Sequence, residues 1–158
     1  MVTFSLSLSA CGRQADNNYK FEKHGIYDVT ETLTGISFKA RFSAEQRELS
    51  FRSPEVINGL SAVSADGNVF SLSYRGINVT VGSFAVKTAG DFFAALELLD
   101  EAGTRTAIGI EAEVEGISAS ARIENGTITE IRFNDGLNTR NYKITTEATG
   151  WKTVQKLG

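Results

Sequence analysis

The stretch IGIEAEVEGISASARIE, residues 108–124, alternates apolar and polar side chains on both sides of a glycine. Glutamates separate the apolar positions before Gly116, and serines and an arginine separate them after it. A period of two is typical of an antiparallel strand with one buried face and one solvated face. The stretch therefore predicts two neighbouring strands, with either a tight turn or a bulged bend at Gly116.

The same period dominates the chain from Gly25 onward. Apolar and polar residues alternate at positions 36–42, 70–74 and 77–81, and a further strand is expected at residues 49–52. Each run predicts a strand that buries its apolar side chains on one face of a sheet.

The segments between these runs contain residues that favour hairpin turns. Asp66-Gly67 and Asn125-Gly126 suit two-residue turns, which need positive φ angles, and Asn134-Asp135-Gly136 suits a longer loop. Gly35 and Gly76 separate strand runs as Gly116 does. We therefore expect the strands to pair in sequence order as a meander that curls.

Residues 91–102, DFFAALELLDEA, break the period of two. Their apolar stripe consists of Phe92, Ala95, Leu96 and Leu99. We expect a helix that Thr88 caps, with Asp91 at the third helical position and Gly103 after the last turn. A helix this apolar must pack on the buried face of the sheet. The predicted fold is mainly β: a curved antiparallel sheet, or open half-barrel, with one main α-helix packed in its concave face.

The single cysteine follows Leu8-Ser9-Ala10 and precedes Gly12 and a polar stretch. This pattern is typical of a bacterial lipoprotein, in which the cysteine after the cleavage site is acylated. Residues 1–11 would then be a residual signal segment, 12–24 a polar tether and 25–158 a single antiparallel-sheet domain. The alternative is that residues 3–10, which also alternate, form a half-buried strand and Cys11 is a small buried hydrophobic residue.

The net charge of the 158-residue chain is −3, and its lysines and arginines are scattered. A nucleic-acid surface would show a clustered basic excess, so no nucleic-acid partner is expected. One cysteine excludes an internal disulfide bond. The expected location is the cell envelope, outside the cytoplasm, with the acyl anchor of Cys11 holding the protein to the membrane.

Only a few polar residues are candidates for catalysis or metal binding. His24 is the only histidine, and no metal-ligand spacing surrounds it. Glu111, Glu113 and Glu115 share one strand face, where they could collect a divalent cation or form a solvated stripe that discourages edge pairing. We expect the solvated stripe, no cofactor, no metal and no enzymatic activity.

Apolar side chains of the predicted interior are the remaining candidates. They would line either a fully packed core or a cleft open enough for an acyl chain, since both need the same lining. The candidate ligand-binding residues are Phe38, Phe42, Phe51, Phe70, Leu72, Tyr74, Phe92, Phe93 and Leu96.

The order of elements also resembles a known group of proteins. Ser53-Pro54-Glu55, where the proline would begin a short helical turn closed by Gly59, is followed by residues 70–77 and then by a short apolar helix. This arrangement resembles small bacterial envelope lipoproteins of the LolA/LolB and LppX/LprG-like carrier superfamily. The resemblance implies a half-barrel that binds an acyl chain or lipid. The alternative function is an envelope interaction module that binds a protein or cell-wall polymer through its sheet surface. The sequence does not identify a protein partner.

Overall fold

The computed structural model describes residues 19–145 and 154–156. Within them, eleven antiparallel strands form one open sheet in the order β7-β6-β5-β4-β3-β2-β12-β11-β10-β9-β8. These strands are β2 (Gly25–Glu31), β3 (Ser37–Phe42), β4 (Arg47–Ser53), β5 (Ser61–Ser64), β6 (Val69–Tyr74), β7 (Ile77–Gly82), β8 (Thr104–Arg105), β9 (Gly109–Val114), β10 (Ile117–Glu124), β11 (Thr127–Asn134) and β12 (Thr139–Thr145). The mainly β fold with one main helix is therefore confirmed.

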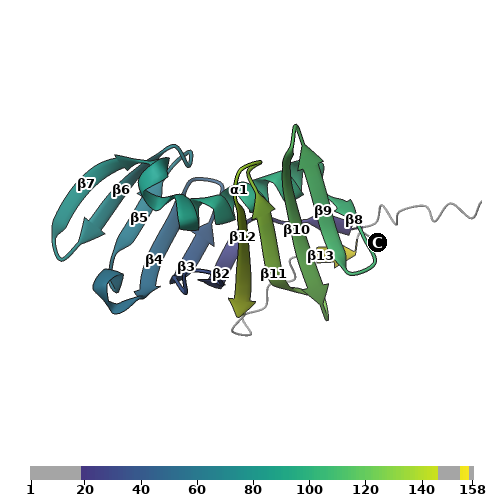
Figure 1. The fold of residues 1–158 in the computed structure, drawn as a ribbon, viewed down its shortest axis with the longest axis horizontal. Helices are drawn as coiled ribbons and strands as arrows, with labels where there is room; N and C mark the ends of the chain where they lie inside the picture. The colour runs from purple at the N-terminus through teal and green to yellow at the C-terminus, as the bar shows by residue number, and fades with distance from the viewer. Residues whose placement is uncertain (1–18, 146–153, 157–158) are drawn as a thin grey trace, which may run out of the picture.

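The remaining elements are short except for one helix. They are the 3₁₀ helices η1 (Glu55–Ile57) and η2 (Ser83–Val86), the helix α1 (Lys87–Ala102), and the paired strands β1 (Tyr19–Phe21) and β13 (Val154–Lys156). Figure 1 shows α1 running along the sheet from the end that carries β6 and β7 toward β9 and β8.

The sheet consists of two meanders joined in the middle. Strands β2 to β7 pair in sequence order, as do β8 to β12, and the pairing of β2 with β12 unites them. Helix α1 connects the outer strand of one meander to the outer strand of the other. Ten strand spacings of about 4.8 Å would span on the order of 48 Å if flat, whereas a helix of 16 residues is about 24 Å long. The sheet therefore curves around its helix.

Three two-residue turns close hairpins. Both residues have positive φ angles in Arg75-Gly76 (50° and 82°), Glu115-Gly116 (52° and 83°) and Asn125-Gly126 (52° and 77°). Gly76 and Gly116 therefore lie in tight turns and not in bulged bends, which were the two predicted alternatives. The prediction for Asp66-Gly67 was wrong, because only the glycine has a positive φ and the connection has four residues.

Two side chains stabilise the 65–68 connection, that of Ser64 at the end of β5 and that of Asp66 within the loop. The Asp66 carboxylate accepts a hydrogen bond from the backbone N–H of Asn68 at 2.8 Å, and the Ser64 hydroxyl accepts one from Gly67 N–H at 2.8 Å. These side-chain oxygens satisfy backbone N–H groups of the turn, as Asp and Ser side chains commonly do in loops.

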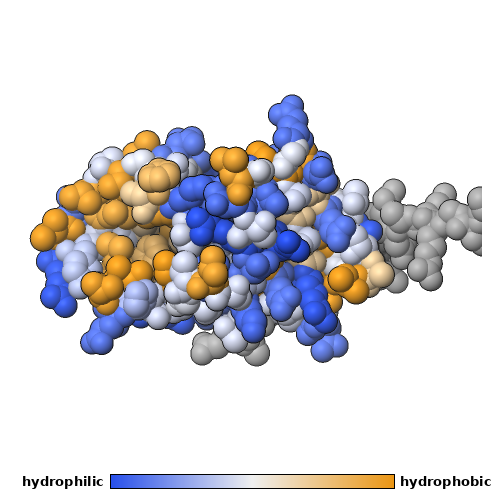
Figure 2. Space-filling model, in the orientation of Figure 1, coloured by the Kyte–Doolittle hydropathy of each residue, from blue (hydrophilic) through white to orange (hydrophobic). Residues whose placement is uncertain are grey.

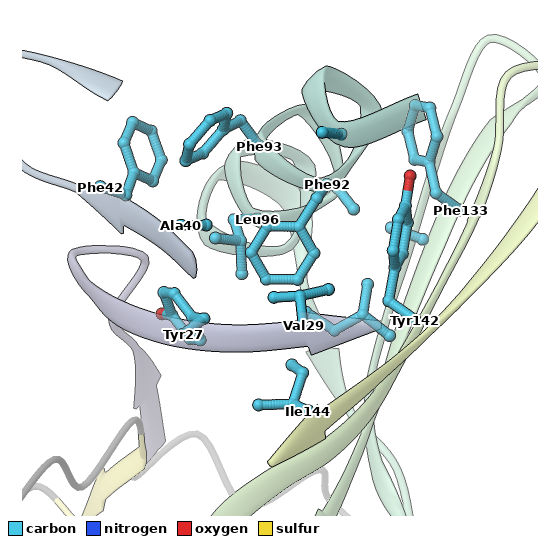
Figure 3. Close-up of a cluster of buried hydrophobic side chains, with 14 of the residues drawn as sticks. Tyr27, Val29, Ala40, Phe42, Phe92, Phe93, Leu96, Phe133, Tyr142 and Ile144 are labelled. Atoms are coloured by element: carbon cyan, nitrogen blue, oxygen red, sulfur yellow. The ribbon is translucent and has the colours of Figure 1, made fainter. Parts of the chain in front are cut away.

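The core lies between α1 and the inner face of the sheet (Figure 3). The ring of Phe92 points from α1 toward the strands and packs edge-on against Tyr27, Phe38 and Tyr142, with centroids 5.4, 6.0 and 5.4 Å apart. Such edge-to-face pairs are favourable beyond their area of contact. The whole predicted stripe of α1 is buried, as are Ala89 and Phe93.

The start of the helix differs from the prediction. Helix α1 begins at Lys87, directly after η2, and Val86 at the N-cap position makes no side-chain cap. Thr88 lies inside the helix, where its carbonyl oxygen accepts a hydrogen bond from Tyr142 Oη at 2.6 Å. Asp91 binds Lys87 and Arg140 instead of completing a capping box. The 3₁₀ turn supplies a helical start that sequence patterns for caps do not detect.

The folded unit also begins earlier than expected. Within the predicted tether, residues 12–24, Tyr19–Phe21 form β1, Phe21 is buried in the core, and Lys23 pairs with Asp100 of α1 at 3.2 Å. Cys11 and the rest of the predicted signal segment lie outside the described residues.

Candidate functional site

The inner face of the sheet extends beyond the helix at the β7 end. Register places Leu72 opposite Val79, in one row with the buried Leu49 and Ala62. Tyr74 lies opposite Ile77 on the same face of the sheet. Ile77 is nevertheless 68% exposed and Val79 49% exposed. Figure 2 shows hydrophobic side chains gathered at this end of the molecule. The sequence predicted a buried face here, and the structure leaves much of it open.

An apolar groove of about 370 Å³ lies between this face and the start of the helix. It is lined by Ile36, Phe51, Ile57, Leu60, Leu72, Phe84, Ala85, Val86, Lys87, Thr88, Ala89 and Arg140. Its volume is within the range of about 300–1,000 Å³ that is typical of small-molecule sites.

Two short 3₁₀ helices form the walls of the groove. On one side η1 follows β4, and backbone hydrogen bonds of Phe51 with Leu60 and Gly59 hold its loop against the strand. Gly59 closes the loop with a φ angle of 86°, as predicted, whereas Pro54 lies at the N-cap of η1, one residue before the predicted first helical position. On the other side η2 carries Phe84, whose side chain is 86% exposed. Exposure of a phenylalanine beside an apolar groove is typical of a binding surface.

Charged side chains form a network at one end of the groove. Lys87 Nζ lies 2.8 Å from an oxygen of Asp91 and 2.9 Å from Asp135 Oδ2. Arg140 Nε donates to the other oxygen of Asp91 at 2.8 Å. Two cations and two carboxylates thus balance each other, and both cationic side chains also line the groove. The groove therefore combines an apolar trough with one polar end.

The network stabilises the charged forms of Lys87 and Asp135. Burial acts to lower the pKa of Lys87, but the hydrogen bonds to Asp91 and Asp135 outweigh it and raise that pKa above its ordinary value. The backbone N–H of Asn138, followed by Lys87 and the N–H of Leu137, lowers the pKa of Asp135 well below its usual range. Lys87 and Asp135 accordingly keep their charges across the physiological pH range.

The candidate ligand-binding residues separate into three groups. Phe51 and Leu72 line the groove. Tyr74 is partly exposed near the sheet edge, where the guanidinium of Arg75 lies 5.0 Å from the centre of its ring. The other six are buried in the core, namely Phe38, Phe42, Phe70, Phe92, Phe93 and Leu96. These six residues therefore belong to a packed core, because the three from the strands and the three from α1 lie in one buried cluster.

Sequence reasoning missed the walls of the groove. Phe84, Val86 and Arg140 were not among the candidates, although they line it. The one available signal was the apolar run Phe84-Ala85-Val86 directly before the helix, which fits neither a strand period nor the helical stripe.

The outer face of the meander formed by β8 to β12 carries two polar grooves, of about 420 and 450 Å³. Both are lined by Glu111, Ser120 and Arg132. Their rims add further charges of both signs, including Arg122, Glu130 and Lys143 beside the first and Glu113 beside the second. These surfaces suit polar partners and offer little to an apolar ligand.

The polar residues singled out from the sequence have ordinary surroundings. The imidazole Nδ1 of His24 lies 3.1 Å from Glu22 Oε1, and its ring packs edge-on against Phe42. Glu111, Glu113 and Glu115 are exposed. Within residues 19–145 and 154–156, no group of three or more histidine, cysteine, aspartate or glutamate side chains could hold a metal ion. No helix in that part of the chain has the length and apolarity needed to cross a membrane.

Comparisons of the chain with protein-family models, curated proteins and solved structures found no match.

Proposed function

We propose that this protein binds a hydrophobic ligand, an acyl chain or lipid, without catalysis. The observation that carries the proposal is the apolar groove of about 370 Å³ beside the exposed Phe84. Apolar surface that stays in contact with water costs about 25 cal/mol per Å². A ligand that covers the apolar lining of this groove would therefore gain free energy.

The shape of the groove restricts the ligand. An extended chain would lie along Leu72, Leu60 and Ile57, and its polar end would meet the network around Lys87 and Arg140. Because Asp91 and Asp135 already neutralise these cations, the ligand needs a polar head group but no net negative charge. The helix need not lift, since the groove opens to solvent beside it.

Binding can be tested with lysophosphatidylcholine and palmitate as probes. Native mass spectrometry should show one bound probe per chain, and the melting temperature should rise with probe concentration, because a ligand of the folded state stabilises it by RT ln(1 + [L]/Kd). No shift with either probe at concentrations below their micelle formation would contradict the proposal.

A matched pair of variants locates the site. Phe84→Ser removes an exposed groove residue and should weaken binding about ten- to a hundredfold, since burying such a side chain contributes about 1.5–3 kcal/mol. Ile108→Ser is the control, because Ile108 is also an exposed apolar residue but lies beside the polar outer groove. Equal losses in the two variants would exclude the apolar groove as the site.

We further propose that Cys11 is acylated and anchors the protein at the outer face of a bacterial membrane, as in the carriers that the sequence resembles. The support is the motif Leu8-Ser9-Ala10-Cys11. Expressed in a bacterium behind a complete lipoprotein signal peptide, the protein should partition into detergent and incorporate labelled palmitate. Both properties should be lost in Cys11→Ala, and membrane partitioning that survives this substitution would refute the anchor.

A second candidate function is an envelope interaction module. The observation that favours it is the pair of polar grooves on the outer face of β9–β11. In that case Arg132→Ala, which alters both grooves, should abolish capture of a polar polymer such as peptidoglycan, and the lipid probes should have no effect.

A further inference from the structure

The two edges of the sheet differ in a way that points to a partner strand. At one edge β8 has only two residues, and the neighbouring β9 carries the exposed Glu111 and Glu113. Short strands and charges are the usual protection of a sheet edge against pairing with another chain. At the other edge β7 has six residues without charge or proline, reading Ile77-Asn-Val-Thr-Val-Gly82. This edge lacks both forms of protection.

The hydrogen-bonding pattern shows which groups of β7 face outward. Ser83 N–H donates to Asn68 O of the β6 side at 2.8 Å. Along a strand, the backbone N–H and C=O groups of successive residues point alternately to one neighbouring strand and to the other side. Since Ser83 bonds toward β6, the odd-numbered residues of β7 also bond to β6. The N–H and C=O groups of Asn78 and Thr80 therefore point away from the sheet. They present a ready template for a further antiparallel strand.

Charge distribution favours a second copy of the same chain. From Val69 to Val86 the only charged residue is Arg75, at the tip of the β6–β7 hairpin. In a two-fold antiparallel pairing centred on Val79, the two arginines would lie at opposite ends of the contact, so no like charges would face each other. Ile77 would lie opposite Val81 of the second copy, which joins apolar side chains on the inner face.

We propose that the protein forms a symmetric dimer in which β7 pairs antiparallel with β7 of a second copy. Asn78 of each copy exchanges backbone hydrogen bonds with Thr80 of the other, and the two sheets become continuous. Because the two-fold axis is perpendicular to the sheet, the inner faces lie on the same side. The exposed surfaces of Ile77 and Val79 are covered, and the two apolar grooves open side by side.

The interface is small, which determines how the dimer behaves. Only six residues of each copy would be in contact. Stable complexes bury about 1,200–2,000 Å², which takes about 20–30 residues a side. We therefore expect a reversible equilibrium, in which sedimentation velocity shows the dimer fraction rising with protein concentration. The amides of Asn78 and Thr80 should exchange with solvent freely in dilute protein and at least tenfold more slowly in concentrated protein. Concentration-independent exchange at both amides would overturn the proposal.

Substitutions at β7 test the geometry. Thr80→Pro removes an outward N–H that β6 does not use and should leave the fold intact, since proline is tolerated on an edge strand, but it should abolish dimerisation. Thr80→Val keeps the N–H and should dimerise as the unsubstituted protein does. Thr80→Pro protein that retains the circular dichroism spectrum and still dimerises would exclude this edge.

A charge-swap experiment identifies the occupant as a second copy. Val79→Lys and Val79→Glu should each be monomeric, because like charges would face each other across the axis, and their mixture should recover the dimer. Val114→Lys at the opposite end of the sheet, where the side chain is similarly exposed, is the control and should dimerise normally. If the mixture stays monomeric, the pairing is not centred on Val79; a variant-independent dimer would place the interface elsewhere. These outcomes are independent of lipid binding.

Discussion

Glu31 is a buried carboxylate at the end of β2, on the face of the sheet that packs against the core. Its Oε1 accepts a hydrogen bond from Leu33 N–H at 3.1 Å, and its Oε2 accepts one from Thr34 N–H at 2.8 Å. Burial raises the pKa of Glu31, but the bonds from Thr34 and Leu33, with the nearby Arg140, outweigh it and leave the pKa below its ordinary value. A buried carboxylate is tolerated because the following turn satisfies it.

The lowered pKa of Glu31 makes stability depend on pH. A carboxyl whose pKa is lower in the folded state contributes stability above its unfolded pKa of about 4.3, and this contribution is lost as the pH falls through the folded value. Urea unfolding at pH 7 and at pH 3 should therefore show a smaller pH-induced loss in Glu31→Gln than in the unsubstituted protein. Glu101→Gln, at an exposed position of α1, is the control. An equally large loss in Glu31→Gln would assign the acid sensitivity to other groups.

At the scale of the element, helix α1 stabilises both meanders at once. Phe92 contacts rings from β2, β3 and β12, and the Arg47 side chain of β4 pairs with Glu97. At its start, Tyr142 Oη bonds to Thr88 O and Arg140 bonds to Asp91, which ties α1 to β12. The helix is thus held by apolar burial along its length and by polar contacts at its N-terminal turns.

Truncation of buried leucines measures how firmly α1 packs. Leu96 is fully buried and Leu99 is 1% exposed, so Leu96→Ala and Leu99→Ala should each lower the free energy of unfolding by about 2–5 kcal/mol. Glu101→Ala, on the exposed side of the helix, should change it by about 0.5 kcal/mol or less. Chemical denaturation provides these values, and losses below about 1 kcal/mol at both leucines would mean that the helix is not firmly packed.

At the scale of the molecule, stability is unevenly distributed across the sheet. The central pairing of β2 with β12 lies under the helix and places Val29 opposite Ile144, both of them buried. Strand β7 has one neighbour and only partial cover for its apolar side chains. Opening of the structure should therefore begin at the β7 end and leave the central strands paired.

Hydrogen exchange of the dilute protein tests this gradient. The amides of Val29, Leu96 and Ile144 should exchange slowest, on the timescale of global unfolding, and the amide of Val79 should exchange at least tenfold faster. The measurement also separates two modes of ligand entry. Slow exchange in α1 fits a ligand that enters the open groove from the side, whereas α1 exchanging as fast as β7 would mean that the helix lifts.

The elements of this fold were predictable because their signals are local. Alternation gave the strands around Phe38 and Ala40, the stripe of Phe92 and Leu96 gave the helix, and Asn125-Gly126 gave its hairpin turn. The start of α1 was misplaced, since Thr88 has the chemistry of a cap and only the preceding 3₁₀ turn puts it inside the helix.

The sequence by itself determined the mainly β architecture, the sequential pairing within each meander and the apolar face of the helix. Only the tertiary structure decided that β2 pairs with β12, that Phe92 of α1 covers Phe38, and that Val79 and Leu72 stay partly open. The pattern of Ile77, Val79 and Val81 is indistinguishable from that of a buried strand. Periodicity reports which side chains share a face, whereas burial depends on what distant segments place over that face.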